Sequence, residues 1–280
     1  MSINSQNKKQ NQLTPEYLAK KDGYEKAFQD LEKFCMFIGY PRSGHSLVGS
    51  LLDAHPNMII AHELNVLHYI KQEYKQAEIY HLLLNNSQNY AKESRIQNDY
   101  TYDVPNQWQG KFETLKVIGD KKGGGTSREL MANFSLLSTL QQTISQPIYF
   151  IHVIRNPYDN ISTIFIRDSK RLSIDLDGCI ELYFARCNTV NKVREKIGDN
   201  KFFHLRHEWM LGNPEVALRE LCNFLGQQAE PDYLKDCVSI LYKSPQGTRA
   251  KVQWNTKAID LVKKEIERFD FLKGYSYRNT

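Results

Sequence analysis

The chain has 280 residues, of which 41% are hydrophobic and 25% charged, and its formal net charge is +5. Such a length and composition are typical of an ordinary soluble globular protein with one substantial core. The positive charge is modest and spread along the sequence, so it suits a phosphate-rich small ligand at least as well as nucleic acid. We expect no nucleic-acid partner.

The N-terminal segment and the cysteines indicate the extent of the domain and the compartment in which the protein works. Residues 1–14 are predicted to be a disordered tail, and residues 15–280 a single domain. The beginning of the chain lacks the apolar core of a signal peptide, and no later segment approaches ~18 consecutive apolar residues, so we expect no membrane span. The five cysteines form no C-x-x-C pair, which predicts reduced, buried thiols in the cytoplasm.

Short apolar runs rich in β-branched and aromatic residues alternate with helical patterns along the chain. We expect strands at residues 35–40, 58–61, 114–119, 147–154 and 201–205. The run at 147–154 is continuously apolar, as in the centre of a sheet. We expect helices at residues 46–54, 63–74, 127–140, 157–167, 176–197, 214–225 and 256–269. This alternation predicts an α/β fold with a central, mostly parallel sheet of about five strands.

Residues 84–110 are polar and aromatic and show no clear period. We expect an irregular insertion on the substrate side of the domain. Its aromatic residues would suit the mouth of an acceptor site, but core packing or a dimer contact explains them equally well, so a homo-oligomer stays open. These aromatics are Tyr90, Tyr100, Tyr102 and Trp108.

The segment 37–46 is almost a nucleotide-binding P-loop. Gly39 and Gly44 have the spacing of G-x-x-x-x-G-K-[ST], and Ser46 fills the hydroxyl position. His45 stands where that pattern has lysine, and the nearest cation is Arg42. Backbone N–H groups at the start of a helix form an anion site, and an arginine adds a forked donor suited to phosphate. The alternative is a tight turn without a ligand.

A second candidate site follows the run at 147–154. Arg155 lies at the carboxyl end of that predicted strand, where open α/β sheets bind ligands. Thr163 comes about two helical turns later, with Ser162 beside it. A guanidinium and a hydroxyl placed in this way could hold a second phosphate, unless the arginine only caps the sheet edge and the threonine only packs in its helix.

Together these segments resemble the sulfotransferases that use 3′-phosphoadenosine-5′-phosphosulfate (PAPS). Pro41-Arg42-Ser43-Gly44 stands where that family has P-[KR]-S-G-[TS], and Arg155…Thr163 where it has an arginine followed eight residues later by Ser or Thr. The likeness is closest to the tyrosylprotein-type and related bacterial branch. It extends over nearly the whole chain after Phe34 and implies a P-loop-like, three-layer α/β/α fold.

The resemblance implies sulfonate transfer from PAPS to a hydroxyl or amine on a small-molecule or peptide acceptor, without a metal. The residues on the 5′ side of the donor would be Arg42, Ser43, Gly44, His45 and Ser46. Arg155, Thr163 and Ser162 would hold the 3′-phosphate. His45 departs from the Thr or Ser of the family, and either donates from its ring or only packs.

The resemblance also implies three further roles. Glu63, about 21 residues after the loop arginine, would be the catalytic base, with His62 as its rival and a solvated carboxylate as the alternative. Lys121, with Lys122 adjacent, would approach the sulfonate together with Arg42, unless the glycines that follow form a flexible turn with solvated lysines. Near the C-terminus, Arg249 or Lys251 would reach the 3′-phosphate, with a solvated charge run as the alternative.

Two other functions stay open from the sequence. A small-molecule kinase would share the loop, but the lysine is missing at position 45 and no Mg²⁺-binding aspartate is evident after a strand. A non-catalytic nucleotide-binding protein could retain the fold, although Glu63 and Lys121 argue against it. The histidines show no convincing ligand spacing, so we expect no metal site.

Overall fold

The computed structural model describes residues 21–93, 95–97, 100–242, 244–245 and 247–279. The predicted tail at residues 1–14 lies outside the described residues. The structure is built around one five-stranded sheet in the order β2-β5-β1-β6-β7, and every neighbouring pair is parallel. The strands are β1 (Lys33–Ile38), β2 (Met58–His62), β5 (Val117–Lys121), β6 (Ile148–Ile154) and β7 (Phe202–Arg206).

This sheet confirms the predicted α/β class. The central strand is β1, whereas β6, which the sequence predicts at the centre, lies one place along between β1 and β7. Both are buried along nearly their whole length. In β1, Phe34, Met36 and Ile38 face one side of the sheet, and Cys35 and Phe37 face the other, because successive strand residues point to opposite faces.

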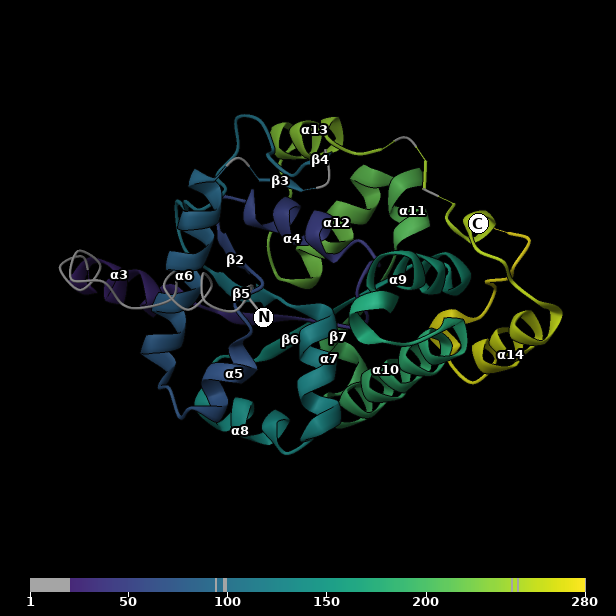
Figure 1. The fold of residues 1–280 in the computed structure, drawn as a ribbon. Coiled ribbons are helices and arrows are strands. Elements are labelled where there is room, and N and C mark those ends of the chain that lie inside the picture. The colour runs from purple at the N-terminus through teal and green to yellow at the C-terminus, as the bar shows by residue number, and fades with distance from the viewer. Residues whose placement is uncertain (1–20, 94, 98–99, 243, 246, 280) are drawn as a thin grey trace.

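Helices cover both faces of the sheet and complete a three-layer arrangement (Figure 1). One face packs against α4 (His45–Asp53), α11 (His207–Gly212), α12 (Pro214–Phe224) and α13 (Pro231–Ser239). The other face packs against α5 (Val66–Lys71), α6 (Gln76–Lys92), α7 (Gly123–Ala132), α8 (Leu136–Thr143), α9 (Pro157–Leu172), α10 (Leu176–Ile197) and α14 (Thr256–Ile266). The short helix α3 (Lys21–Ala27) precedes β1.

Two predicted helices differ from the structure. The helix expected at 63–74 begins only at Val66, because Glu63 and Asn65 have left-handed backbone angles, with φ of 60° and 69°. The helix expected at 127–140 is two helices, α7 and α8. Asn133 separates them, since its side-chain oxygen accepts from the backbone N–H and the hydroxyl of Ser135 at 3.1 and 2.7 Å.

The expectation of an irregular segment at 84–110 is wrong for its first part. Residues 84–92 belong to α6, whose Leu82, Leu83 and Leu84 are buried. A two-residue antiparallel ladder follows, formed by β3 (Ile96–Gln97) and β4 (Tyr100–Thr101). Most of the polar residues that conceal the period of α6 are exposed or half-buried, but His81 and Ser87 are buried.

Candidate functional site

A cavity of about 820 Å³ opens at the carboxyl ends of the parallel strands. The loops after β1, β2, β5, β6 and β7 all contribute to its wall, as expected for an open α/β sheet. Among the described residues, nine lysines and arginines line it but only two acids, Glu63 and Asp168. The nine cations are Arg42, Lys121, Lys122, Arg128, Arg155, Arg167, Arg171, Arg186 and Lys251. Such an excess of positive charge favours a ligand with several negative charges.

The turn between β1 and α4 forms the floor of this cavity. Gly44 caps α4 with φ of +103°, and a Cβ there would lie 2.6 Å from the ring of His207, so the position requires glycine. The buried Ser43 hydroxyl lies 3.2 Å from both the carbonyl oxygen of Tyr40 and Nδ1 of His45, and these contacts fix the turn from within. The N-terminus of the nine-residue helix α4 therefore points its N–H groups into a cationic cavity.

His45 packs beneath the turn. Its Nε2 lies 3.2 Å from the carbonyl oxygen of Ile38, and its Nδ1 lies 3.2 Å from the hydroxyl of Ser43. Burial, aided by the nearby Lys121, lowers the pKa of His45 to about 3, so the ring is neutral. A neutral ring beside a carbonyl must donate to it from Nε2. A Cβ at Gly123 would lie 2.3 Å from this ring, which explains the glycine that begins α7.

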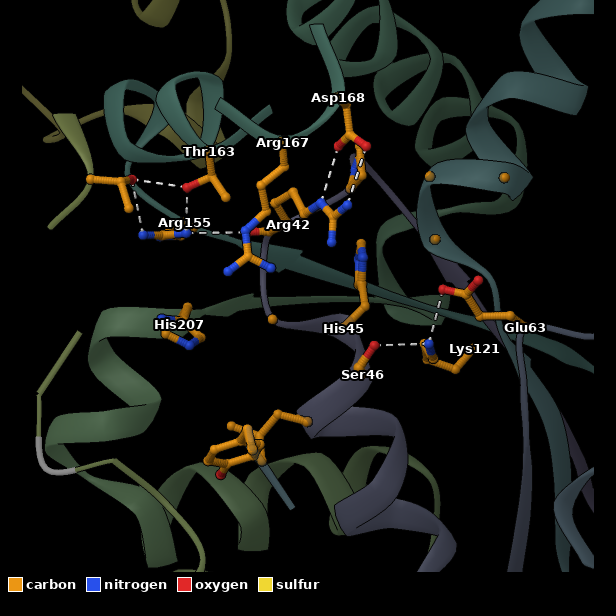
Figure 2. A pocket seen from close by; sticks show the side chains of 18 of the residues that line it. Arg42, His45, Ser46, Glu63, Lys121, Arg155, Thr163, Arg167, Asp168 and His207 are labelled. Atoms are coloured by element: carbon orange, nitrogen blue, oxygen red, sulfur yellow. Dashed lines mark hydrogen bonds and ion pairs between the residues drawn. The ribbon is translucent and has the colours of Figure 1, made fainter. Parts of the chain in front are cut away.

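Lys121, Glu63 and Ser46 meet at one end of the cavity (Figure 2). The Lys121 side chain is almost wholly buried, and its Nζ donates to the Ser46 hydroxyl at 3.0 Å and to Glu63 Oε1 at 3.2 Å. Lys122 Nζ lies 2.8 Å from Glu63 Oε2. Burial alone would raise the pKa of Glu63, but Lys121 and Lys122 outweigh it and hold that pKa well below its usual range. Glu63 is therefore ionised.

Asp120 holds the loop that carries Glu63. Its buried carboxylate accepts from the backbone N–H groups of Leu64, Asn65 and Val66 at 3.1, 2.8 and 3.0 Å. These bonds satisfy donors at the start of α5 and support the left-handed conformation of Glu63. Asp120 and Lys121 end β5, whose register places Lys121 opposite His62. The rival base His62 does not line the cavity, and its ring stacks on Tyr90 with 3.9 Å between centroids.

Arg155 and Thr163 lie at the other end of the cavity, as Figure 2 shows. Arg155 Nη1 donates to the Thr163 hydroxyl at 3.2 Å, and Nη2 donates to the Thr248 hydroxyl at 3.3 Å. The two threonine hydroxyls are 2.9 Å apart. Thr248 directly precedes Arg249, in the late loop that also carries Lys251. The structure thus brings an arginine and two hydroxyls together, a set suited to a phosphate.

The loop arginine, Arg42, is paired across the cavity wall. Its Nε and Nη2 lie 3.1 and 3.2 Å from the two carboxylate oxygens of Asp168 on α9. This forked pair fixes the guanidinium while leaving part of it exposed in the cavity. The carbonyl of Arg42 accepts from Arg155 Nη1 at 3.3 Å, so the loop and the second motif are joined.

Three residues from the sequence-based site do not line the cavity: Ser43, Ser162 and Arg249. Ser162 accepts from the indole N–H of Trp254 at 2.9 Å within the packed interior. The expectation that Arg249 reaches toward a phosphate does not fit its contacts. Its guanidinium pairs with buried Asp159 and donates from Nη1 to the carbonyls of Ser276, Tyr277 and Asn279. Of the two late-loop cations, only Lys251 lines the cavity.

Sequence reasoning missed several arginines of the cavity. Arg167 and Arg171 follow Thr163 at four-residue intervals on α9, and this helical spacing is a signal that could have found them. Arg186 on α10 and Arg128 on α7 carry no comparable signal, because nothing local indicates that their helix faces turn toward the loop. Among the described residues there is no group of three or more His, Cys, Asp or Glu side chains placed to hold a metal ion. No helix of the described chain is long and apolar enough to cross a membrane.

Comparison with known proteins assigns the family. A model described as sulfotransferase family matches residues 36–231. The solved sulfotransferase domain from the curacin biosynthetic pathway is 14% identical, with a TM-score of 0.56, and the match covers 85% of this chain and 97% of that one. Sulfotransferase STF9 from Mycobacterium avium is 13% identical, with a TM-score of 0.51, and covers 90% of this chain and 81% of that one.

At such low identity these two structures show a shared fold, which agrees with the parallel sheet and its flanking helices. A comparison with curated protein sequences gave no match. The family model, in contrast, spans well over half of the chain, including the β1 loop, Glu63, Lys121 and Arg155. The chain therefore belongs to the sulfotransferase family.

Proposed function

We propose that this sulfotransferase moves a sulfonate group from PAPS to a hydroxyl or amine of its acceptor. The observation that carries the proposal is the position of Lys121, whose ammonium contacts both the P-loop hydroxyl of Ser46 and the carboxylate of Glu63. A cation between an anion-binding loop and a carboxylate suits a reaction in which one group accepts a proton and another stabilises developing negative charge.

The donor would bind between the start of α4 and Arg155, and we call the part of the cavity around Arg155 and Thr163 the nucleotide end. The start of α4, with Arg42 and Ser46, would hold the 5′-phosphosulfate, and His45 would support the turn from beneath. Arg155, Thr163 and Thr248 would hold the 3′-phosphate, because their donors already converge on one another. Lys251 lines the same cavity and adds a cation at this end.

The transfer step would take place at the other end of the cavity, around Glu63 and Lys121, which we call the transfer end. The acceptor O–H or N–H gives its proton to Glu63, and the acceptor atom forms a bond to sulfur. The bond between sulfur and the bridging phosphate oxygen breaks, and its electron pair leaves with 3′,5′-phosphoadenosine (PAP). Lys121 and Ser46 would stabilise the charge on that oxygen. As Lys121 shifts from Glu63 to the leaving oxygen, the pKa of Glu63 rises, because its closest buried counter-charge is withdrawn.

Two further features belong to the proposal. The reaction needs no metal, because the cavity's own lysines and arginines supply the charge that Mg²⁺ supplies in triphosphate chemistry. The protein acts in the cytoplasm, in keeping with its five free cysteines, all of which are buried. The acceptor is a small molecule or a peptide, and the aromatic side chains of Tyr100, Tyr102 and Tyr242 line the same cavity.

Calorimetric titration with PAP and with ATP tests the proposal. We expect PAP to bind more tightly than ATP and its affinity to be unchanged by Mg²⁺ or by a chelator. Incubation with PAPS and candidate acceptors should then yield products heavier by one sulfonate group. Equal binding of ATP together with Mg²⁺-dependent transfer of a labelled γ-phosphate would instead establish the kinase alternative.

A further inference from the structure

Arg186 is a buried cation whose hydrogen bonds are incomplete. Its side chain comes from α10, is only 8% exposed and lines the cavity. None of the described residues provides a hydrogen-bond acceptor for its Nε or Nη1. A buried guanidinium normally finds partners for its donors, because burying an unpaired charge costs several kcal/mol. Two donors that have no acceptor within the described protein point to one supplied by a ligand.

Two further arginines, Arg128 and Arg171, line the same cavity. Both are exposed, and each has a carboxylate neighbour, Glu129 at 3.2 Å and Asp168 at 3.3 Å. Asp168 is already shared with Arg42, so positive charge remains in excess. Burial, together with the nearby charges of Arg128 and Arg171, lowers the pKa of Arg186 to about 10, although Asp168 acts in the opposite direction. The positive charges of Arg128 and Arg171 therefore lie close enough to act on Arg186.

Arg128 lies on the transfer side of the loop, and Arg186 comes from α10, which packs against α7. Helix α7 starts directly after Lys121 and Lys122, and its first residues pack against His45 and Pro41. Arg128 follows six residues after Lys122, which is about 9 Å along a helix. Arg155 and Thr163 lie on the opposite side of Arg42 and His45 from Glu63 and Lys121 (Figure 2). The donor's two phosphate groups therefore have other partners, and the acceptor would occupy the space beside α7.

We propose that Arg186, Arg128 and Arg171 bind an anionic group on the acceptor, so that the enzyme sulfonates a molecule that already carries a phosphate, sulfate or carboxylate. The inference rests on the proposed function and adds the acceptor's charge to it. Arginine suits this task because its planar fork pairs with the oxygens of such groups in a bidentate manner. Arg186 fixes the anion from the buried side, and the two exposed arginines attract it at the opening.

The test is a titration of the full-length, PAP-saturated protein with inorganic phosphate. We expect the wild type to bind phosphate, and Arg186→Gln to bind it about tenfold more weakly or worse, as is usual when a charged hydrogen bond is lost. Arg194→Gln is the matched control, since Arg194 lies on the same helix but does not line this cavity. Arg171→Gln, at an exposed position where a lost ion pair costs at most about 1 kcal/mol of stability, should weaken phosphate binding several-fold.

Each remaining outcome counts against a specific claim. Phosphate binding that is equal in wild type, Arg186→Gln and Arg194→Gln, or absent from the wild type, overturns the acceptor inference while PAP binding stands. A loss of PAP affinity in Arg186→Gln assigns the arginine to the donor and also overturns it. A wild type that fails to bind PAP contradicts the proposed function, and the inference falls with it. Because Arg186→Gln removes a poorly compensated buried charge, its melting temperature should not fall below that of the wild type.

Discussion

The two ends of the cavity are built differently. At the nucleotide end, Arg155 donates to two threonine hydroxyls and a backbone carbonyl. At the transfer end, Lys121 meets an ionised carboxylate. Donors that contact hydroxyl groups can turn to a phosphate by exchanging one hydrogen-bond acceptor for another. A cation held by a carboxylate can instead be exchanged between two partners during a reaction. On the proposed assignment, the nucleotide end binds the donor and the transfer end carries out the reaction.

Replacing the carboxylate gives the largest expected effect. Glu63→Gln keeps the shape of the side chain but removes the proton acceptor, so turnover should fall by about 10²–10⁴-fold. PAP affinity, measured by calorimetry, should stay within a few-fold of the wild type. Glu32→Gln, at an exposed ion pair with Lys116, is the control and should leave both quantities unchanged. Unchanged turnover in Glu63→Gln would remove Glu63 from the mechanism and favour a non-catalytic protein or a different base.

Replacing the lysine should come next. Lys121→Met preserves the buried stem but removes the charge opposite the leaving oxygen, and turnover should fall by about 10²–10³-fold. The exposed neighbour provides the comparison, because Lys122→Met should cost much less. Turnover and PAP affinity are measured on the same preparations. Equal losses in the two variants would show that the cavity needs only total charge at this end, not a cation at one position.

The third prediction is that Arg249 stabilises the fold and does not bind the nucleotide. Arg249→Gln breaks a buried pair with Asp159 and should lower the free energy of unfolding by about 3–5 kcal/mol. Urea unfolding measures this loss, and Arg268→Gln at an exposed pair should cost less than about 1 kcal/mol. PAP affinity of the folded variant should change little. Weakened PAP binding without a loss of stability would restore the role that the sequence predicts for Arg249.

The fourth prediction tests the nucleotide end itself. Thr163→Val removes one hydroxyl beside Arg155 and should weaken PAP binding by about tenfold. Binding of adenosine 5′-phosphate, which lacks the 3′-phosphate, should not change. Thr189→Val removes another buried threonine hydroxyl, on α10 and outside the residues that line the cavity, and serves as the control. Equal weakening of both nucleotides would mean that Thr163 acts on the loop instead of the 3′-phosphate.

The smallest expected effect concerns His45, whose ring packs beneath the turn between β1 and α4. The pKa of His45 is about 3 in the folded chain and about 6.5 when unfolded, so the unfolded state binds more protons between those values. Stability should therefore fall as pH falls from about 6.5 toward 3. His45→Asn should reduce this slope by at most about 1.4 kcal/mol per pH unit. Urea titrations from pH 7 to 4 measure it, with the exposed His68→Asn as control. An unaltered slope would place the acid sensitivity elsewhere.

Local sequence was sufficient to predict most of the strands and helices around the site. The strand β1, the helix that follows it, and the starts of α9 and α12 at Pro157 and Pro214 were all predicted within a few residues, because glycine and proline act on the backbone over a few bonds. The segment after β2 was different. Its helix begins late because Asp120, from another strand, binds the backbone N–H groups there.

The sequence by itself determined the fold class, the anion-binding turn, and the positions of Glu63, Lys121 and Arg155 at strand ends, since all parallel strands deliver their carboxyl ends to one edge. It also placed Thr163 two turns into the helix that follows Arg155. Only the tertiary structure decided which other cations face the cavity. Arg249 forms an ion pair with Asp159, ninety residues away, whereas Arg186 lines the cavity and has no acceptor for its Nε and Nη1 among the described residues. Local patterns set backbone conformation, but the partner that captures a long charged side chain comes from distant elements, and packing alone selects it.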